Sequence, residues 1–208
     1  MDAKQKIPRL DHPVVLLIDA QPGFFLELRG MVVAESIEVR WQMLLAMCRC
    51  LELPAIATFE EPMRNGWLSE KCEREWPDRG IRIVKKTFDC CGEPQVVTAL
   101  AEAGRTQVIV AGAETDVCVL QSVLSLLALG YEVFLLEDCL ASTDANTRPA
   151  LAMMYSAGAV PCTLKTAFYE LAKSVDVCRD PGSFGPGWAE LIRNFGEPEA
   201  LPEWQPAR

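Results

Sequence analysis

The stretch from Thr106 to Gly130, TQVIVAGAETDVCVLQSVLSLLALG, changes its pattern halfway. It begins with an apolar run as long as a buried strand, passes through a glycine and three polar residues, and continues with helical spacing. A strand that runs directly into a helix is typical of a parallel α/β sheet. The same stretch puts Cys118 near the start of the predicted helix, just after the predicted strand.

Segments on both sides of this stretch repeat the same alternation of strand and helix. Besides Thr106–Gly112, strands are predicted at Val14–Asp19, Leu53–Phe59, Ile81–Lys86, Tyr131–Asp138 and Gly158–Leu164, and helices at Ala34–Cys50, Pro94–Ala103, Asp116–Leu129, Asp144–Ser156 and Thr166–Lys173. This order predicts a three-layer, doubly wound α/β fold with a mostly parallel six-stranded sheet, which is Rossmann-like. Gly104 and Gly130 are expected where helices end.

Length and composition favour one globular domain. The 208 residues are 50% hydrophobic and 24% charged, and we expect a domain at residues 1–180 with a Pro- and Gly-rich appendage at 181–208. The net charge of -9 argues against nucleic acid as a partner, because phosphate binding needs clustered basic residues. No stretch predicts a membrane span or a signal peptide. A small-molecule substrate and a cytoplasmic location are therefore expected.

The cysteine and histidine content indicates reduced thiols and no metal site. Nine cysteines, an odd number, without an export signal favour free thiols over a disulfide framework. The chain has one histidine, His12, and no Cys-x-x-Cys pair, so a zinc site is not expected.

Three kinds of reactive side chain follow predicted strands. Asp19 ends the first strand, Lys85 or Lys86 ends the third, and Cys118 follows the fourth. Ligands of an open parallel sheet bind at the carboxyl ends of its strands, so these side chains are candidates for one site. With Thr115 as N-cap, the helix start and a nearby lysine would favour a Cys118 thiolate. Taken singly, each residue also has an ordinary structural explanation, as a core thiol, a turn aspartate or a solvated lysine.

Four blocks of the sequence resemble the isochorismatase-like cysteine hydrolases, in the same order and at similar separations. They are VVLLIDAQPGFF, VKKTFDCC, AGAETDVCVLQSVLSLLALGYEVFLLEDCLAST and GAVPCTLKTAFYEL, and the resemblance covers roughly Pro13 to Leu171. It implies a catalytic triad of Asp19, Lys85 and Cys118. Lys85 is preferred to Lys86 because the family lysine stands three places before an aromatic residue, here Phe88.

The resemblance also implies a reaction. A cis peptide is expected at Ala113–Glu114, with the backbone N–H groups of Glu114 and Cys118 as the oxyanion site. Attack by Cys118 would form a thioester from a small amide or a related C–N bond, without a cofactor. The nicotinamidase branch of the family binds its metal through an aspartate and two histidines. This chain has only one histidine, so that metal site is not expected.

Three other functions stay open from the sequence. They are hydrolysis of an isochorismate-type vinyl ether, a binding or regulatory role with little turnover, and thiol redox chemistry at the neighbouring Cys90 and Cys91. Asp138, after the fifth strand, is expected to be structural.

Apolar side chains outside the predicted core suggest a substrate pocket and a subunit interface. The predicted pocket residues are Phe24, Phe25, Trp67 and Phe88. A homo-oligomer is predicted because several apolar segments lie outside the expected sheet-and-helix core. These segments are Gly30–Glu35, Trp67, Trp76, Phe184 and Trp188.

Overall fold

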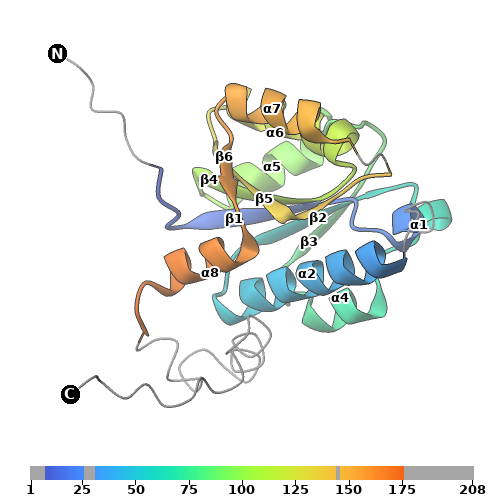
Figure 1. The fold of residues 1–208 in the computed structure, drawn as a ribbon, viewed down its shortest axis with the longest axis horizontal. Coiled ribbons are helices and arrows are strands. Elements are labelled where there is room, and N and C mark those ends of the chain that lie inside the picture. Colours follow the sequence, from blue (N-terminus) through green and yellow to red (C-terminus); the bar gives the residue numbers. More distant parts are fainter. Residues whose placement is uncertain (1–7, 26–30, 144–145, 176–208) are drawn as a thin grey trace, which may run out of the picture.

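Six parallel strands form one sheet in the computed structural model, which describes residues 8–25, 31–143 and 146–175 (Figure 1). The strands are β1 (Pro13–Ile18), β2 (Ala55–Glu60), β3 (Ile81–Lys85), β4 (Gln107–Ala113), β5 (Glu132–Ala141) and β6 (Val160–Cys162). Their order across the sheet is β3-β2-β1-β4-β5-β6, and all neighbours are parallel. The predicted doubly wound, Rossmann-like fold is confirmed, with its switch point between β1 and β4.

Helices cover both faces of the sheet, as Figure 1 shows. One face carries α2 (Met31–Cys50), α4 (Glu70–Glu75) and α8 (Leu164–Ala172), and the other carries α5 (Pro94–Glu102), α6 (Leu120–Ala128) and α7 (Arg148–Ser156). Strand β1 is buried on both faces because its side chains alternate between two cores. Val15 and Leu17 join the core that includes Trp41, whereas Val14 and Leu16 join the core that includes Val123.

Short helices line the carboxyl edge of the sheet. They are α1 (Pro22–Phe25), α3 (Pro62–Asn65) and the 3₁₀ turn η1 (Cys90–Gly92). Gly104 and Gly130 follow α5 and α6 with φ angles of 64° and 90°, as expected for glycines that end helices. No helix of the described residues is both long and apolar enough to cross a membrane.

The element that carries Cys118 differs from its prediction. Thr115–Val119 form a π-helical turn, η2, before α6 begins. The N-cap residue is Glu114, so the expectation of Thr115 as N-cap is wrong. The Thr115 hydroxyl instead donates to the Ala141 carbonyl oxygen at 2.9 Å, which ties η2 to the end of β5.

Strand β5 runs to Ala141, three residues beyond the prediction. Its pairing with β4 is interrupted, because Val110 pairs with Leu135 whereas Gly112 pairs with Leu140. Helix α2 begins before the predicted Ala34. The first residues of the helix predicted from Asp144 fall partly outside the described residues, and the appendage at 181–208 falls wholly outside them.

The two central strands touch closely where the site begins. Gly112 of β4 has a φ of 125°, and a Cβ there would lie 1.9 Å from the Ile18 carbonyl oxygen of β1. Only glycine fits this position, since both its backbone angle and the contact exclude a side chain. The contact brings the end of β1, and hence Asp19, against the strand that leads to Cys118.

Candidate active site

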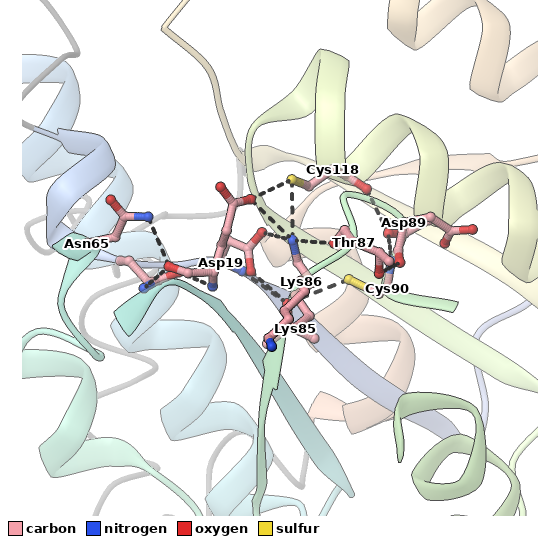
Figure 2. Close-up of polar contacts among 12 residues, drawn as sticks. Asp19, Asn65, Lys85, Lys86, Thr87, Asp89, Cys90 and Cys118 are labelled. Atoms are coloured by element: carbon pink, nitrogen blue, oxygen red, sulfur yellow. Dashed lines mark hydrogen bonds and ion pairs between the residues drawn. The ribbon is translucent and has the colours of Figure 1, made fainter. Parts of the chain in front are cut away.

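The Lys85 ammonium lies at the centre of the candidate site (Figure 2). Its Nζ is 2.7 Å from Asp19 Oδ2 and 3.5 Å from Cys118 Sγ, and it donates to the Thr87 carbonyl oxygen at 3.0 Å. Side chains alternate along β3 and beyond it, so Lys85 is 1% exposed and Lys86 is exposed. The structure therefore brings Lys85, and not Lys86, together with Asp19 and Cys118.

Asp19 is fixed at the end of β1 by the neighbouring strand. The Thr58 hydroxyl of β2 donates to Asp19 Oδ1 at 2.9 Å, and the Asp19 N–H donates to the Thr58 carbonyl oxygen at 3.1 Å. Asp19 is fully buried and has a φ of 46°, which few residues other than glycine adopt. Such backbone angles persist only where the surroundings enforce them. One carboxylate oxygen is thus bound to Thr58, and the other faces Lys85.

Cys118 lies in the π-helical turn and is 4% exposed. Its carbonyl oxygen accepts from the Ser122 hydroxyl at 2.7 Å, and that hydroxyl in turn accepts from the Cys90 N–H at 2.9 Å. This chain links the nucleophile's helix to η1, which follows the lysine strand. The turn therefore holds the Cys118 thiol against the Lys85 ammonium.

Glu60 is a fourth member of the site that the sequence analysis missed. It ends β2, and its Oε2 lies 3.5 Å from Lys85 Nζ and 3.7 Å from Cys118 Sγ. The buried Gln21 side chain holds the backbone of Glu60 through two hydrogen bonds. The Glu60 N–H donates to Gln21 Oε1, and the Glu60 carbonyl oxygen accepts from Gln21 Nε2. The signal was present in the sequence, since Glu60 follows a buried strand just as Asp19 does.

Burial and mutual charge set the protonation of the site. Burial raises the pKa of Asp19 more than Lys85 and Thr58 lower it. Burial lowers the pKa of Lys85, but the Asp19 carboxylate outweighs it, and the net pKa is raised. Burial, followed by the charge of Asp19, raises the pKa of Cys118 well above that of an ordinary thiol. The raised pKa values favour an ammonium at Lys85 and a protonated thiol at Cys118 in the resting site.

This result corrects the expectation that the helix start and a nearby lysine favour a Cys118 thiolate. The π-helical start and Lys85 are both in place, but burial and the Asp19 carboxylate oppose a second negative charge. Cys118 becomes a thiolate only when a neighbouring base takes its proton. Asp19 suits that role, because its raised pKa makes it a stronger proton acceptor than an exposed aspartate.

Three potential ligand atoms lie close enough to surround a cation. Cys118 Sγ and one oxygen each from Asp19 and Glu60 lie within 4.8 Å of one another. Lys85 Nζ, however, lies within 3.5 Å of all three groups, so an ammonium already supplies the positive charge among them. The geometry favours a lysine-centred site over a metal-centred one.

The peptide bond between Ala113 and Glu114 is cis, as the resemblance implies. The Glu114 carbonyl oxygen accepts from the N–H groups of Val117 and Val119. Its side chain is bound elsewhere, since Glu114 Oε2 accepts from the Thr143 N–H and hydroxyl. The use of the Glu114 and Cys118 N–H groups as an oxyanion site stays a prediction.

The four aromatic residues predicted to line a pocket have different environments. Phe24 lines a narrow crevice with Trp41 and Glu114, next to the site. Trp67 packs on Phe59 with ring centroids 4.9 Å apart and is 45% exposed. Phe88 is 53% exposed, and the side chain of Phe25 lies outside the described residues.

Other residues singled out from the sequence have structural contacts. Cys90 and Cys91 are both free thiols, and Cys90 is buried. Asp138 Oδ1 accepts from the Leu164 N–H at 2.8 Å, and Asp138 Oδ2 pairs with Arg40 at 3.3 Å. Asp138 therefore joins β5 to α8 and α2, as its predicted structural role requires.

Comparison with known proteins identifies the family to which the chain belongs. The family model of the isochorismatase domain matches residues 13–166. Isochorismatase family protein 1A of Dictyostelium discoideum is 31% identical over 134 residues, which cover 62% of this chain and 65% of that protein, just under two thirds of its length.

Solved structures share the fold. YcaC from Pseudomonas aeruginosa, determined with hexane-2,5-diol and covalent acrylamide, has a TM-score of 0.77 and 27% identity over 91% of this chain and 98% of its own. Escherichia coli YcaC, described as an octameric hydrolase of unknown specificity, has a TM-score of 0.77 and 24% identity over 92% and 98%. With the matched domain and the shared fold, the chain belongs to the isochorismatase-like hydrolase family.

Proposed function

We propose that this protein is a cysteine-dependent hydrolase of a small-molecule amide or a related C–N bond. One observation carries the proposal: Lys85 Nζ lies 2.7 Å from Asp19 Oδ2 and 3.5 Å from Cys118 Sγ. A nucleophile and a base that both contact one cation are the groups that nucleophilic acyl transfer needs. The site requires no cofactor for this chemistry.

The first half of the reaction forms a thioester. Asp19 accepts the thiol proton while Lys85 stabilises the thiolate, and Cys118 Sγ bonds to the carbonyl carbon. The carbonyl oxygen becomes an oxyanion, to which the Glu114 and Cys118 N–H groups would donate. When the C–O double bond re-forms, the C–N bond breaks. The nitrogen takes the proton from Asp19 and leaves as ammonia or an amine.

The second half of the reaction releases the acid. Water gives a proton to Asp19 as its oxygen bonds to the thioester carbon, and the C–S bond then breaks. The Cys118 thiolate recovers its proton from Asp19, which restores the resting site. Lys85 keeps its ammonium charge throughout, because its raised pKa prevents it from losing a proton to either neighbour.

The buried thiol favours amide chemistry over vinyl ether hydrolysis. Protonation of a vinyl ether needs an acid and no nucleophile, whereas here Cys118 touches both Lys85 and Glu60. A binding or regulatory role would leave the buried Asp19–Lys85 pair without a purpose that offsets its desolvation.

The test is a screen of primary amides, N-alkyl amides and ureides for release of ammonia or amine. Cys118→Ala should lose the hydrolysis that wild type shows. Cys50→Ala, at the half-buried thiol that ends α2 and has Arg49 and Glu75 as its charged neighbours, should keep it. Electrospray mass spectrometry of a rapidly quenched reaction should detect the acyl-enzyme on Cys118. Hydrolysis that persists in Cys118→Ala would exclude this mechanism.

We also propose a homo-oligomer in the reducing cytoplasm. Trp67 and Phe88 are about half exposed, and Met63 is 95% exposed. Exposed apolar side chains of this size support a surface that another subunit covers. Trp76 does not contribute, because it is partly buried and lies under the Arg82 guanidinium at 4.7 Å. Phe184, Trp188 and the side chains of residues 31–35 lie outside the described residues. A mass of one 23.0 kDa chain by light scattering would contradict this.

A further inference from the structure

The carboxylate of Glu60 lies between the Cys118 thiol and the solvent. Glu60 Oε2 lies 3.7 Å from Cys118 Sγ, and the Glu60 side chain is 26% exposed. The side chains of Lys85 and Asp19 are both 0% exposed. Of the charged groups that touch the site, Glu60 is therefore the one that an arriving substrate meets first.

Glu60 is held in this position by its backbone. Gln21 is fully buried. Its Oε1 accepts a hydrogen bond from the Glu60 N–H at 2.7 Å, and its Nε2 donates to the Glu60 carbonyl oxygen at 3.0 Å. Asn65 Nδ2 donates to the same carbonyl oxygen at 2.9 Å. Oε2 is directed at Lys85, whereas Oε1 makes no hydrogen bond to the described part of the chain. Within the described part of the chain, no donor thus competes with a substrate for Oε1.

Among the described residues, the charges around the thiol sum to a negative value. Asp19 and Glu60 contribute two carboxylates against the single Lys85 ammonium, and the thiol itself is protonated at rest. A second anion within a few ångströms of Glu60 is repelled, whereas an N–H donor or a cation is attracted. The repulsion acts at the reacting atom, because Glu60 and Lys85 both contact Cys118 Sγ.

We propose that Glu60 is a charge filter that admits neutral or cationic substrates with an N–H group beside the reacting carbon and rejects those with a carboxylate there. Carboxamides, ureides and amino-substituted amides fit this requirement, and a dicarboxylate such as isochorismate does not. The proposal rests on the proposed function for its substrates, but the filter itself is a property of the Cys118 environment.

Two alkylating reagents that differ by one charge measure the filter. Iodoacetamide is neutral and iodoacetate is anionic, and both bond to the same sulfur. The ratio of their rates at Cys118, mapped by mass spectrometry and divided by the ratio for glutathione, cancels the thiolate fraction. Wild type should prefer iodoacetamide about tenfold more than glutathione does. Glu60→Gln should bring the ratio close to that of glutathione.

Glu61→Gln is the matched control, since it removes the same charge one residue away. The Glu61 side chain is 65% exposed and pairs with Arg64 at 3.6 Å, so this variant should keep the wild-type ratio. Glu60→Asp retains the charge and should also keep the preference. In wild type, 1 M salt should weaken it, because salt screens charges that solvent reaches. This last arm needs no variant to fold.

The outcomes separate the filter from the hydrolase. Equal ratios in wild type and glutathione, or an unchanged ratio in Glu60→Gln, would overturn the filter even if amides are hydrolysed. A tenfold preference that Glu60→Gln removes would support the filter even if no amide in the screen is cleaved. Alkylation requires no turnover, so the two proposals stand or fall on different measurements.

Discussion

The two ends of the sheet treat buried polar groups in opposite ways. At the amino end, Gln107 begins β4 and uses its neutral amide fully: Oε1 accepts from the N–H groups of Asp11 and His12, and Nε2 donates to the Arg9 carbonyl oxygen and to Glu132. At the carboxyl end, Lys85, Asp19, Glu60 and Cys118 bring charges and a thiol into contact.

The difference assigns a stabilising role to the amino end of the sheet and a chemical role to its carboxyl end. A buried amide with all its hydrogen bonds made has nothing left to react, so it fixes the chain entering the sheet. A buried ion pair is costly to desolvate, and a protonated thiol beside a carboxylate can pass on its proton. The following changes to each end test this division.

The largest effect is expected from Lys85→Met. It leaves Asp19 buried without its cation and removes the contact to the thiol, so unfolding should become about 3–5 kcal/mol easier, and hydrolysis should fall by at least about 10²-fold. Chemical denaturation and turnover assays measure the two losses. The exposed neighbour Lys86→Met should change stability by no more than about 0.5 kcal/mol. Equal losses in the two variants would reassign the lysine.

Removing both charges should cost less than removing one. In the double variant Asp19→Leu with Lys85→Met no buried charge is left unpaired, and apolar replacements of a buried pair are often neutral or stabilising. Its loss of stability should therefore be smaller than that of Lys85→Met by about 2 kcal/mol or more. Additive losses in denaturant melts would mean that the pair does not act as a unit.

At the amino end, Gln107→Leu should weaken the fold without touching the chemistry. It leaves several backbone groups without partners, at a cost of about 1–3 kcal/mol in unfolding free energy. The alkylation rate of Cys118 per folded molecule should equal that of wild type. A changed rate would show that the two ends of the sheet are coupled.

The smallest effect is a shift in the pH dependence of Cys118 alkylation. Burial and the carboxylates raise the pKa of Cys118, so the wild-type rate should still be rising above pH 9. A thiolate carries the charge that Glu60 repels, and Glu60→Gln should therefore lower the pKa and move the profile to lower pH. A shift to higher pH, or none, would show that Glu60 does not act on the thiol through its charge.

Much of the fold follows from local pattern, because buried parallel strands are continuous apolar runs. Gly104 and Gly130 also correctly predicted where two helices end. Asp19 stands directly after such a run and Cys118 follows another within one turn of helix, so both positions could be predicted from the sequence. Glu60 follows such a run as well, so the same reasoning predicts it, although it is absent from the triad that the resemblance implies.

Other features depend on contacts that a sequence does not display. The thiol of Cys118 is protonated because burial and Asp19 outweigh the helix start, and burial is a property of the folded chain. Thr115 looked like an N-cap, but its hydroxyl finds the Ala141 carbonyl oxygen across the sheet. Lys85 and Lys86 differ in the face of the strand on which their side chains lie, and that of Lys85 is buried whereas that of Lys86 is exposed.

The strand order also means that the site is shared between two lengths of chain. Asp19, Glu60 and Lys85 all precede the Gly104–Thr106 connection, whereas Cys118 follows it, and the two parts meet at the close contact of Gly112 with Ile18. A polypeptide cut in that connection would yield one fragment with the base and one with the nucleophile. Hydrolysis would then require both fragments, and its rate would measure how much of the complex between them has formed.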